Sequence, residues 1–163
     1  MNKKIALNKG ALAPCPKVLV SCRGANGEDN ALAVAYCGNC SFAPPMVMVG
    51  IVPSRYSYHM IKETGCFVVN IPVKGYEEVF NYLGSASGRD GNKLKEKNVA
   101  TAEADKVKAL LLTDCPVNIE CTVVDSIMTG SHEMFIGKVE CVHADENIVD
   151  ANGVIDFSKL DLL

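Results

Sequence analysis

Two serines and an arginine lie close together at Ser54, Arg55 and Ser57, directly after Pro53. Serine is a favoured N-cap residue, and the residues that follow have the spacing of a helix. A helix N-terminus presents unpaired N–H groups and partial positive charge, so hydroxyls and a guanidinium placed there could bind a phosphate group. The alternative is an ordinary capped surface helix with an exposed arginine, and the spacing alone does not decide between the two.

Eight cysteines, many for 163 residues, offer a second kind of chemistry. Only Cys37 and Cys40 form a Cys-x-x-Cys pair, and a zinc site of that type would need a second close pair, so no metal site is predicted. The first residues lack the sustained apolar stretch of a signal peptide, which favours reduced, structural cysteines. A thiol redox pair at Cys37 and Cys40 remains an alternative. The other cysteines that fall within apparent strands act as small hydrophobes: Cys22, Cys66, Cys121 and Cys141.

The composition limits the classes of protein to which this chain can belong. Its net charge is -3 and its pI about 5.6, so it lacks the basic surplus of a general nucleic-acid binder. With 48% apolar and 21% charged residues, it should fold into a globular structure. No apolar run approaches the ~20 residues of a membrane helix. We therefore expect a cytoplasmic protein that uses neither nucleic acid nor a membrane as a partner.

The Ser54–Ser57 segment must be positioned by the elements around it. Buried strands are predicted at Ala31–Tyr36 and Met46–Val52, with Gly38, Asn39, Pro44 and Pro45 in the link between them. A helix is predicted from about Tyr58 to Gly65, which is a typical helix stop. The remaining strands are expected at Lys17–Arg23, Cys66–Ile71, Cys115–Met128, Glu133–His143 and Asn147–Ile155. Short helices are expected at Tyr76–Leu83 and Asn92–Lys97, a loop at Gly84–Gly91, and irregular or helical surface at Ala100–Ala109.

Strands thus outnumber helices and follow one another in hairpin order. This order favours a mainly β fold, an antiparallel barrel with a few peripheral helices. A doubly wound sheet would need more helices between its strands, and no Gly-x-Gly-x-x-Gly follows a strand. No linker divides the chain, so residues 1–163 are predicted to form a single domain.

Several motifs, in their order, resemble those of a known family. They include VLVSCRG, Pro44-Pro45 before a valine-rich strand, Ser-Arg-x-Ser, ETGCFVVNIP, GSASGRDGNKLK, CPVNIEC and GSHEMFIGKV. Together they span roughly Pro16 to Leu160. The chain resembles the flavin reductase-like, FMN-binding split-barrel family and, within it, the flavoredoxin group.

The resemblance implies a six-stranded antiparallel split β-barrel that forms a homodimer and holds FMN non-covalently near the dimer interface. Tyr36 falls where the flavoredoxin group usually has tryptophan, at the edge of the isoalloxazine, and Ser57 where relatives often have threonine. The family's usual C-terminal extension is expected to be missing, because the sequence stops at Leu163. Matching the motifs implies the cofactor-binding residues Asn30, Tyr36, Cys37, Gly38, Asn39, Cys40, Ser41, Ser54, Arg55, Ser57, Lys93 and His132.

The function implied is an NAD(P)H:flavin oxidoreductase or a flavoredoxin-like electron carrier with a redox protein partner. Hydride transfer to a flavin needs no catalytic acid or base, so none is predicted among the residues. NADH or NADPH is the expected electron donor of the oxidoreductase. A flavin- or haem-storage protein is an alternative from another class, since His59, His132 and His143 could ligate haem, although no Cys-x-x-Cys-His signal is present.

Each motif residue also has a purely structural interpretation from the sequence. Asn30 suits a turn, Tyr36 a core or interface position, Lys93 an exposed helix, and His132 a hairpin turn. These alternatives remain open at this stage.

Overall fold

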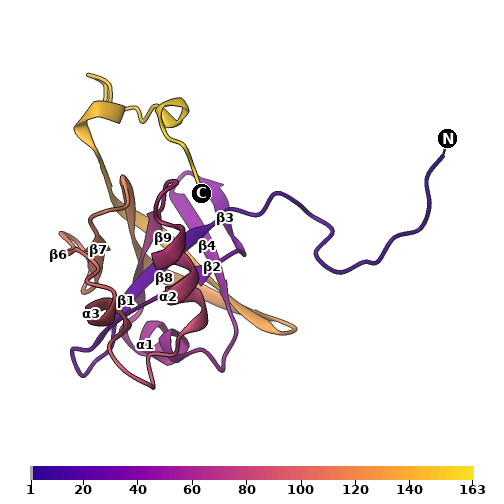
Figure 1. Cartoon of the computed structure of the whole chain (residues 1–163), viewed down its shortest axis with the longest axis horizontal. Helices are drawn as coiled ribbons and strands as arrows, with labels where there is room; N and C mark the ends of the chain where they lie inside the picture. Colours follow the sequence, from indigo (N-terminus) through magenta and orange to yellow (C-terminus); the bar gives the residue numbers. More distant parts are fainter. Residues whose placement is uncertain (1) are drawn as a thin grey trace.

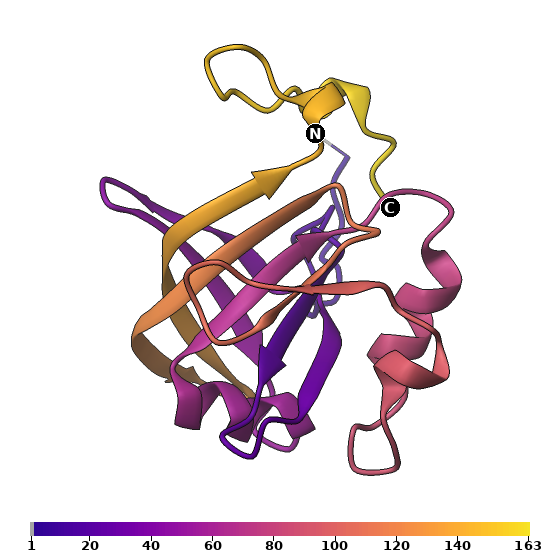
Figure 2. The ribbon, with the colours of Figure 1, turned by 90° about the vertical axis from the view of Figure 1, so that its left-hand side faces the viewer.

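The computed structural model describes residues 2–163, and its main feature is one antiparallel sheet of seven strands. The strands lie in the order β2-β1-β5-β8-β9-β4-β3, so β2 and β3 form its two edges. Figure 2 shows how strongly the sheet curls. Its strands are β1 (Val18–Arg23), β2 (Asp29–Val34), β3 (Cys37–Phe42), β4 (Pro45–Ile51), β5 (Cys66–Ile71), β8 (Val117–Thr129) and β9 (His132–Ala144). The predicted mainly β, antiparallel architecture is confirmed, with seven strands in place of six.

The core lies on the inner face of this curled sheet. Val20, Phe67 and Phe135 are among its buried side chains, contributed by β1, β5 and β9. Strands rich in β-branched and aromatic residues pack well on such a surface, and their burial supplies most of the driving force for folding. Gly137 on β9 faces Phe67 so closely that a Cβ would lie 2.6 Å from its ring, which explains why a glycine occupies this core position.

Three helices lie at the margins of the sheet (Figure 1). The helices are α1 (Tyr56–Thr64), α2 (Glu77–Ser85) and the short α3 (Lys93–Glu96). Helix α1 ends at Gly65, whose φ of 69° is left-handed, as the sequence predicts for a helix stop. Leu83 of α2 and Leu94 of α3 pack with Leu19 in a second buried cluster, which anchors both helices to the outside of the sheet.

Four predicted segments differ from the structure. The strand predicted at Ala31–Tyr36 is instead β2, which ends at Val34. The predicted link after it contains a further strand, Cys37–Phe42, which pairs with β4. Within 100–109, the strand β6 (Thr101–Glu103) pairs with β7 (Leu110–Leu112), whose leucines are buried. Residues 147–155 carry only the 3₁₀ turn η1 (Glu146–Ile148) and one isolated bridge, Val149 to Ile155. Short or polar segments such as these take their conformation from their neighbours, which local propensity does not reveal.

Two segments project from the body of the molecule. Residues 2–17 are exposed and extend away from the sheet, and β8 and β9 form a long hairpin that runs past its edge (Figure 1). The hairpin turns at Gly130, whose φ of 79° suits glycine. Among residues 2–163, no helix is long and apolar enough to cross a membrane.

Candidate functional site

A small cavity of about 100 Å³ brings together five of the residues predicted to bind a cofactor. They come from three separate stretches of the chain, namely β2, the start of α1 and the start of α3. The cavity therefore exists only because the sheet edge and two helix N-termini converge. These five residues are Asn30, Ser54, Arg55, Ser57 and Lys93.

Helix α1 begins at this cavity in a way that differs from the predicted serine cap. Its N-cap residue is Arg55, whose side chain makes no capping hydrogen bond. The buried hydroxyl of Ser57 instead accepts a hydrogen bond of 2.7 Å from the Nδ2 of Asn30. Because the first N–H groups of a helix lack backbone partners, an uncapped N-terminus offers them to a ligand together with its partial positive charge.

Lys93 is the most unusual residue of the cavity. Its side chain is only 4% exposed, and its ammonium donates to the carbonyl oxygens of Leu83 at 2.8 Å and Ala86 at 3.1 Å. Within residues 2–163, no carboxylate forms an ion pair with it. Burial lowers the pKa of Lys93 to about 8, with a further lowering from the charge of Arg55. A buried cation without a counter-ion is costly, so this site favours an anionic ligand. The alternative interpretation from the sequence, an exposed lysine on a helix, is wrong, because the side chain is buried.

The loop after α2 supplies residues that the sequence analysis did not assign to the site. Ser85, the last residue of α2, and Ser87, Gly88 and Arg89 of the following loop line the cavity, and Arg89 donates from Nη1 to the carbonyl oxygen of Ser54 at 3.1 Å. The guanidinium of Arg89 also lies 5.7 Å from the ring centre of Tyr56. The abundance of glycine and hydroxyl residues at 84–91 was the available signal, since such loops commonly surround phosphate groups.

Gly88 allows this loop to approach α1. A Cβ at position 88 would lie 2.3 Å from Cδ1 of Tyr56 and 3.1 Å from Oδ1 of Asn30. Tyr56 is fixed on its other side by a hydrogen bond of 2.6 Å to Glu28. The close approach that forms the cavity wall therefore requires glycine at this position.

A second group of predicted residues lies beside the hairpin end of β9. The rings of Tyr36 and His132 meet edge to face, with centroids 4.9 Å apart. Nδ1 of His132 also lies 2.8 Å from the hydroxyl of Ser131. Tyr36 is 49% exposed, so one aromatic surface remains available for contact.

The segment from Cys37 to Ser41 forms most of the edge strand β3 rather than a tight loop. Its pairing with β4 slips between Asn39 and Ser41, so Cys40 occupies a bulge and is exposed. Burial raises the pKa of the Cys37 thiol to about 11. A thiol with so high a pKa is a poor nucleophile, which disfavours a redox pair with Cys40.

Strand β4 connects the two groups. The N–H of Gly50 on β4 donates to the carbonyl of Tyr36 at 2.7 Å, and four residues later the chain reaches Ser54. Because an extended residue spans at most about 3.3 Å, the four residues from Gly50 to Ser54 span at most roughly 13 Å, so Tyr36 lies near the cavity. An elongated ligand could therefore contact both groups.

The other two histidines lie elsewhere. His59 is exposed on α1, and His143 on β9 is hydrogen-bonded to Glu120. The three histidines therefore occupy separate parts of the structure and do not form a common ligand set.

Comparison with known proteins identifies a family and several relatives that this chain resembles. The model of a family described as "Flavin reductase like domain" matches residues 12–159. An uncharacterized protein from Archaeoglobus fulgidus is 34% identical over 120 residues, which cover 72% of this chain and 67% of that protein. A protein from Methylorubrum extorquens named FMN reductase (NADH) RutF is 29% identical over 126 residues, which cover 77% of this chain but only 60% of that protein.

Among solved structures, flavoredoxin of Desulfovibrio vulgaris (Miyazaki F) superimposes with a TM-score of 0.87 at 29% identity. The superposition covers 96% of this chain and 85% of that one. The shared fold therefore extends through the strands and helices that form both groups of candidate residues.

Proposed function

Because this chain belongs to the flavin reductase-like domain family, we propose that it is an FMN-binding redox protein. Its activity would be that of an NAD(P)H:flavin oxidoreductase or of a flavoredoxin-like electron carrier. The names of two relatives support this proposal, one an FMN reductase that uses NADH and the other a flavoredoxin.

The observation that carries the proposal is the buried ammonium of Lys93, which has no carboxylate partner among residues 2–163. Arg55 and the uncapped N-terminus of α1 border the same cavity. A phosphate dianion there would receive hydrogen bonds from the ammonium, the guanidinium and the helix N–H groups, all of which favour negative charge. Since two of the three ammonium protons already bind carbonyl oxygens, Lys93 has one donor left for the ligand.

The residues near Tyr36 suit the flat ring of the same ligand. Tyr36 offers an aromatic surface, His132 a ring nitrogen, and β3 the backbone groups of Cys37, Gly38, Asn39, Cys40 and Ser41 at the edge of the sheet. An edge strand leaves N–H and C=O groups unpaired, as the donors and acceptors of a flavin ring require. When bound, FMN would supply the redox chemistry, accepting a hydride or electrons and passing them on. The protein's residues would hold and orient it.

The direct test is to titrate FMN into the purified protein and measure its affinity by flavin fluorescence. Binding at micromolar FMN or tighter is expected, with affinity reduced about 10- to 100-fold in Lys93→Met, because a charged hydrogen bond is worth about 1.5–3 kcal/mol. Lys95→Met, an exposed lysine two residues away, is the matched control. A folded protein that does not bind FMN would refute the proposal.

A second experiment separates the two activities. NADH or NADPH is added anaerobically to the FMN complex, and the flavin absorbance is followed. Rapid bleaching identifies an oxidoreductase, and reduction only by a redox protein identifies a carrier. Retention of FMN with no turnover by any donor would favour a storage protein instead.

A further inference from the structure

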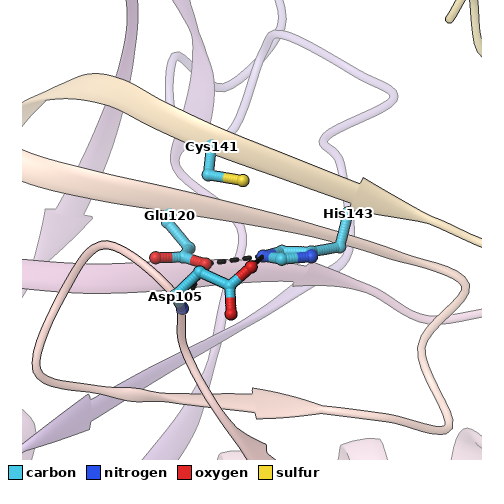
Figure 3. A group of neighbouring side chains, drawn as sticks. All are labelled: Asp105, Glu120, Cys141 and His143. Atoms are coloured by element: carbon cyan, nitrogen blue, oxygen red, sulfur yellow. Dashed lines mark hydrogen bonds and ion pairs between the residues drawn. The ribbon is translucent and has the colours of Figure 1, made fainter.

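Four side chains capable of binding a metal converge at a place remote from the cavity described above. Asp105, Glu120, Cys141 and His143 each offer one ligand atom, and these atoms all lie within 4.8 Å of one another (Figure 3). None of the four lines the cavity that contains Lys93. The flavin proposal gives this cluster no role.

The pairing of β8 with β9 explains how three of the four meet. Glu120 lies directly opposite Cys141, and Asn118 opposite His143. Cys141 and His143 are two residues apart on one strand, so both side chains project from the same face as Glu120. Asp105 comes from the loop between β6 and β7, which passes over this face (Figure 3).

Glu120 is already held in position as a ligand would need to be. Its side chain is fully buried and accepts backbone hydrogen bonds from Asp105 at 2.9 Å, Lys106 at 2.6 Å and Val107 at 3.1 Å. Nε2 of His143 is 2.6 Å from Oε1 of the same carboxylate and 4.0 Å from Oδ2 of Asp105. Supporting hydrogen bonds of this kind orient the first ligands of metal sites.

The donor set identifies the class of cation. A thiolate, an imidazole and two carboxylates suit zinc and similar transition metals, whereas calcium and magnesium prefer oxygen ligands alone. With zinc bonds of about 2.0–2.3 Å, tetrahedral ligand atoms lie about 3.3–3.6 Å apart. Ligand atoms up to 4.8 Å apart must therefore approach one another by roughly 1 Å, and Asp105 is the exposed member of the set, whose side chain is free to move.

We propose that Asp105, Glu120, Cys141 and His143 bind one zinc-class divalent cation, which fastens the β6–β7 loop to the main sheet. Nε2 of His143 binds the cation through its lone pair, as a neutral imidazole whose proton is on Nδ1, and any proton that Nε2 carries before binding passes to solvent. The thiol of Cys141 loses its proton to solvent and binds as a thiolate. Glu120 keeps its three backbone hydrogen bonds, so the loop stays anchored while the cation adds a fourth tie.

The test uses Co²⁺ as a spectroscopic probe on the full chain, freed of metal with a chelator. One equivalent should produce a thiolate-to-cobalt charge-transfer band in the near ultraviolet, and Zn²⁺ should abolish it by displacement. Cys141→Ser should lose the band, and His143→Gln should weaken binding tenfold or more. Cys15→Ser, which removes an exposed thiol outside the cluster, should behave like the wild type.

If the cluster binds no metal, the contact between Glu120 and His143 is only a structural hydrogen bond. Absence of the band in the wild type, or equal affinity in Cys141→Ser, would overturn the proposal. Circular dichroism checks that each variant is folded. Asp105→Asn changes only the exposed member of the ligand set, so it tests metal binding without disturbing the core. Because FMN affinity is measured separately, failure of the metal site does not affect the flavin proposal.

Discussion

At the scale of single residues, the environment of Lys93 departs from the ordinary environment of a lysine. A lysine in a Lys-rich segment is usually exposed, yet this one is buried against carbonyl oxygens beside Arg55. Such burial shifts the balance between its charged and neutral forms, so its ligand affinity should depend on pH.

FMN affinity is expected to fall as pH rises above about 8. The pKa of Lys93 in the free protein is lowered from 10.5 to about 8, so the ammonium is present below that value and absent above it. If only the charged form binds phosphate well, the dissociation constant should rise up to tenfold per pH unit above 8. Fluorescence titrations between pH 7 and 10 measure this dependence.

Lys93→Met should show weak affinity with no such slope. In the absence of ligand, the wild type should gain stability relative to Lys93→Met as pH rises from 8 toward 10.5, because the unfolded lysine there binds more protons than the folded one. A flat affinity profile in the wild type would contradict a role for the ammonium.

At the scale of elements, the loop at 84–91 and helix α1 form the cavity through one close approach. Gly88→Ala should place a Cβ against the ring of Tyr56 and push the loop outward. We expect FMN affinity to fall about tenfold or more, because the residues that bind the phosphate would no longer lie close together.

Gly91→Ala is the control in the same loop. Its Cβ would meet only the end of the exposed Glu96 side chain, which can move aside. Equal affinities for the two variants would show that the approach of the loop to α1 does not shape the site.

A second element-scale feature is the carboxylate that fastens α1 to the β8–β9 hairpin. Glu133, only 5% exposed, accepts hydrogen bonds from Tyr58 and Lys62 of α1 and from Ser126 of β8. Lys62 first, then Ser126 and Tyr58, lower the pKa of Glu133 to about 2. This depressed pKa stabilises the fold above about pH 4.5, and the stabilisation is lost as pH falls toward 2.

Glu133→Gln should therefore lower the urea midpoint at pH 7 and have progressively less effect as pH falls from 5 to 2. Glu140→Gln, at an exposed position on β9, should change little at either pH. A difference between wild type and Glu133→Gln that stays constant across this range would mean that the carboxylate's charge is not involved.

At the scale of the whole molecule, apolar side chains remain exposed around the second group of site residues. Tyr36, Ile127 and Met128 are 49%, 60% and 52% exposed, and Ile127 pairs with Met134 near the start of β9. Exposed apolar patches often mark interfaces. We propose that this patch forms the interface of the homodimer that the resemblance implies, with the ring of the flavin near it.

Ile127→Glu should convert the dimer to a monomer, measured by light scattering at micromolar concentration, and should also weaken FMN binding. Val154→Glu is the matched control, since Val154 is 61% exposed but lies outside the sheet. A wild type that is already monomeric would refute the dimer.

The single-domain assignment and the cytoplasmic location stay predictions.

The sequence alone determined the features that depend on local pattern. Runs of apolar residues predicted β1, β5, β8 and β9, Gly65 predicted the end of α1, and the order of motifs predicted the family. These succeed because side-chain period and backbone freedom are properties of neighbouring residues.

The tertiary structure decided everything that depends on distant residues meeting. Only the fold showed that Lys93 is buried with no carboxylate partner in the described part of the chain, that Ser57 accepts a hydrogen bond from Asn30 instead of capping α1, and that residues 37–42 form a strand. It also brought Asp105 to Glu120, Cys141 and His143. Burial, pKa and ligand geometry arise from packing between segments far apart in the chain, and no local pattern in one sequence records that packing.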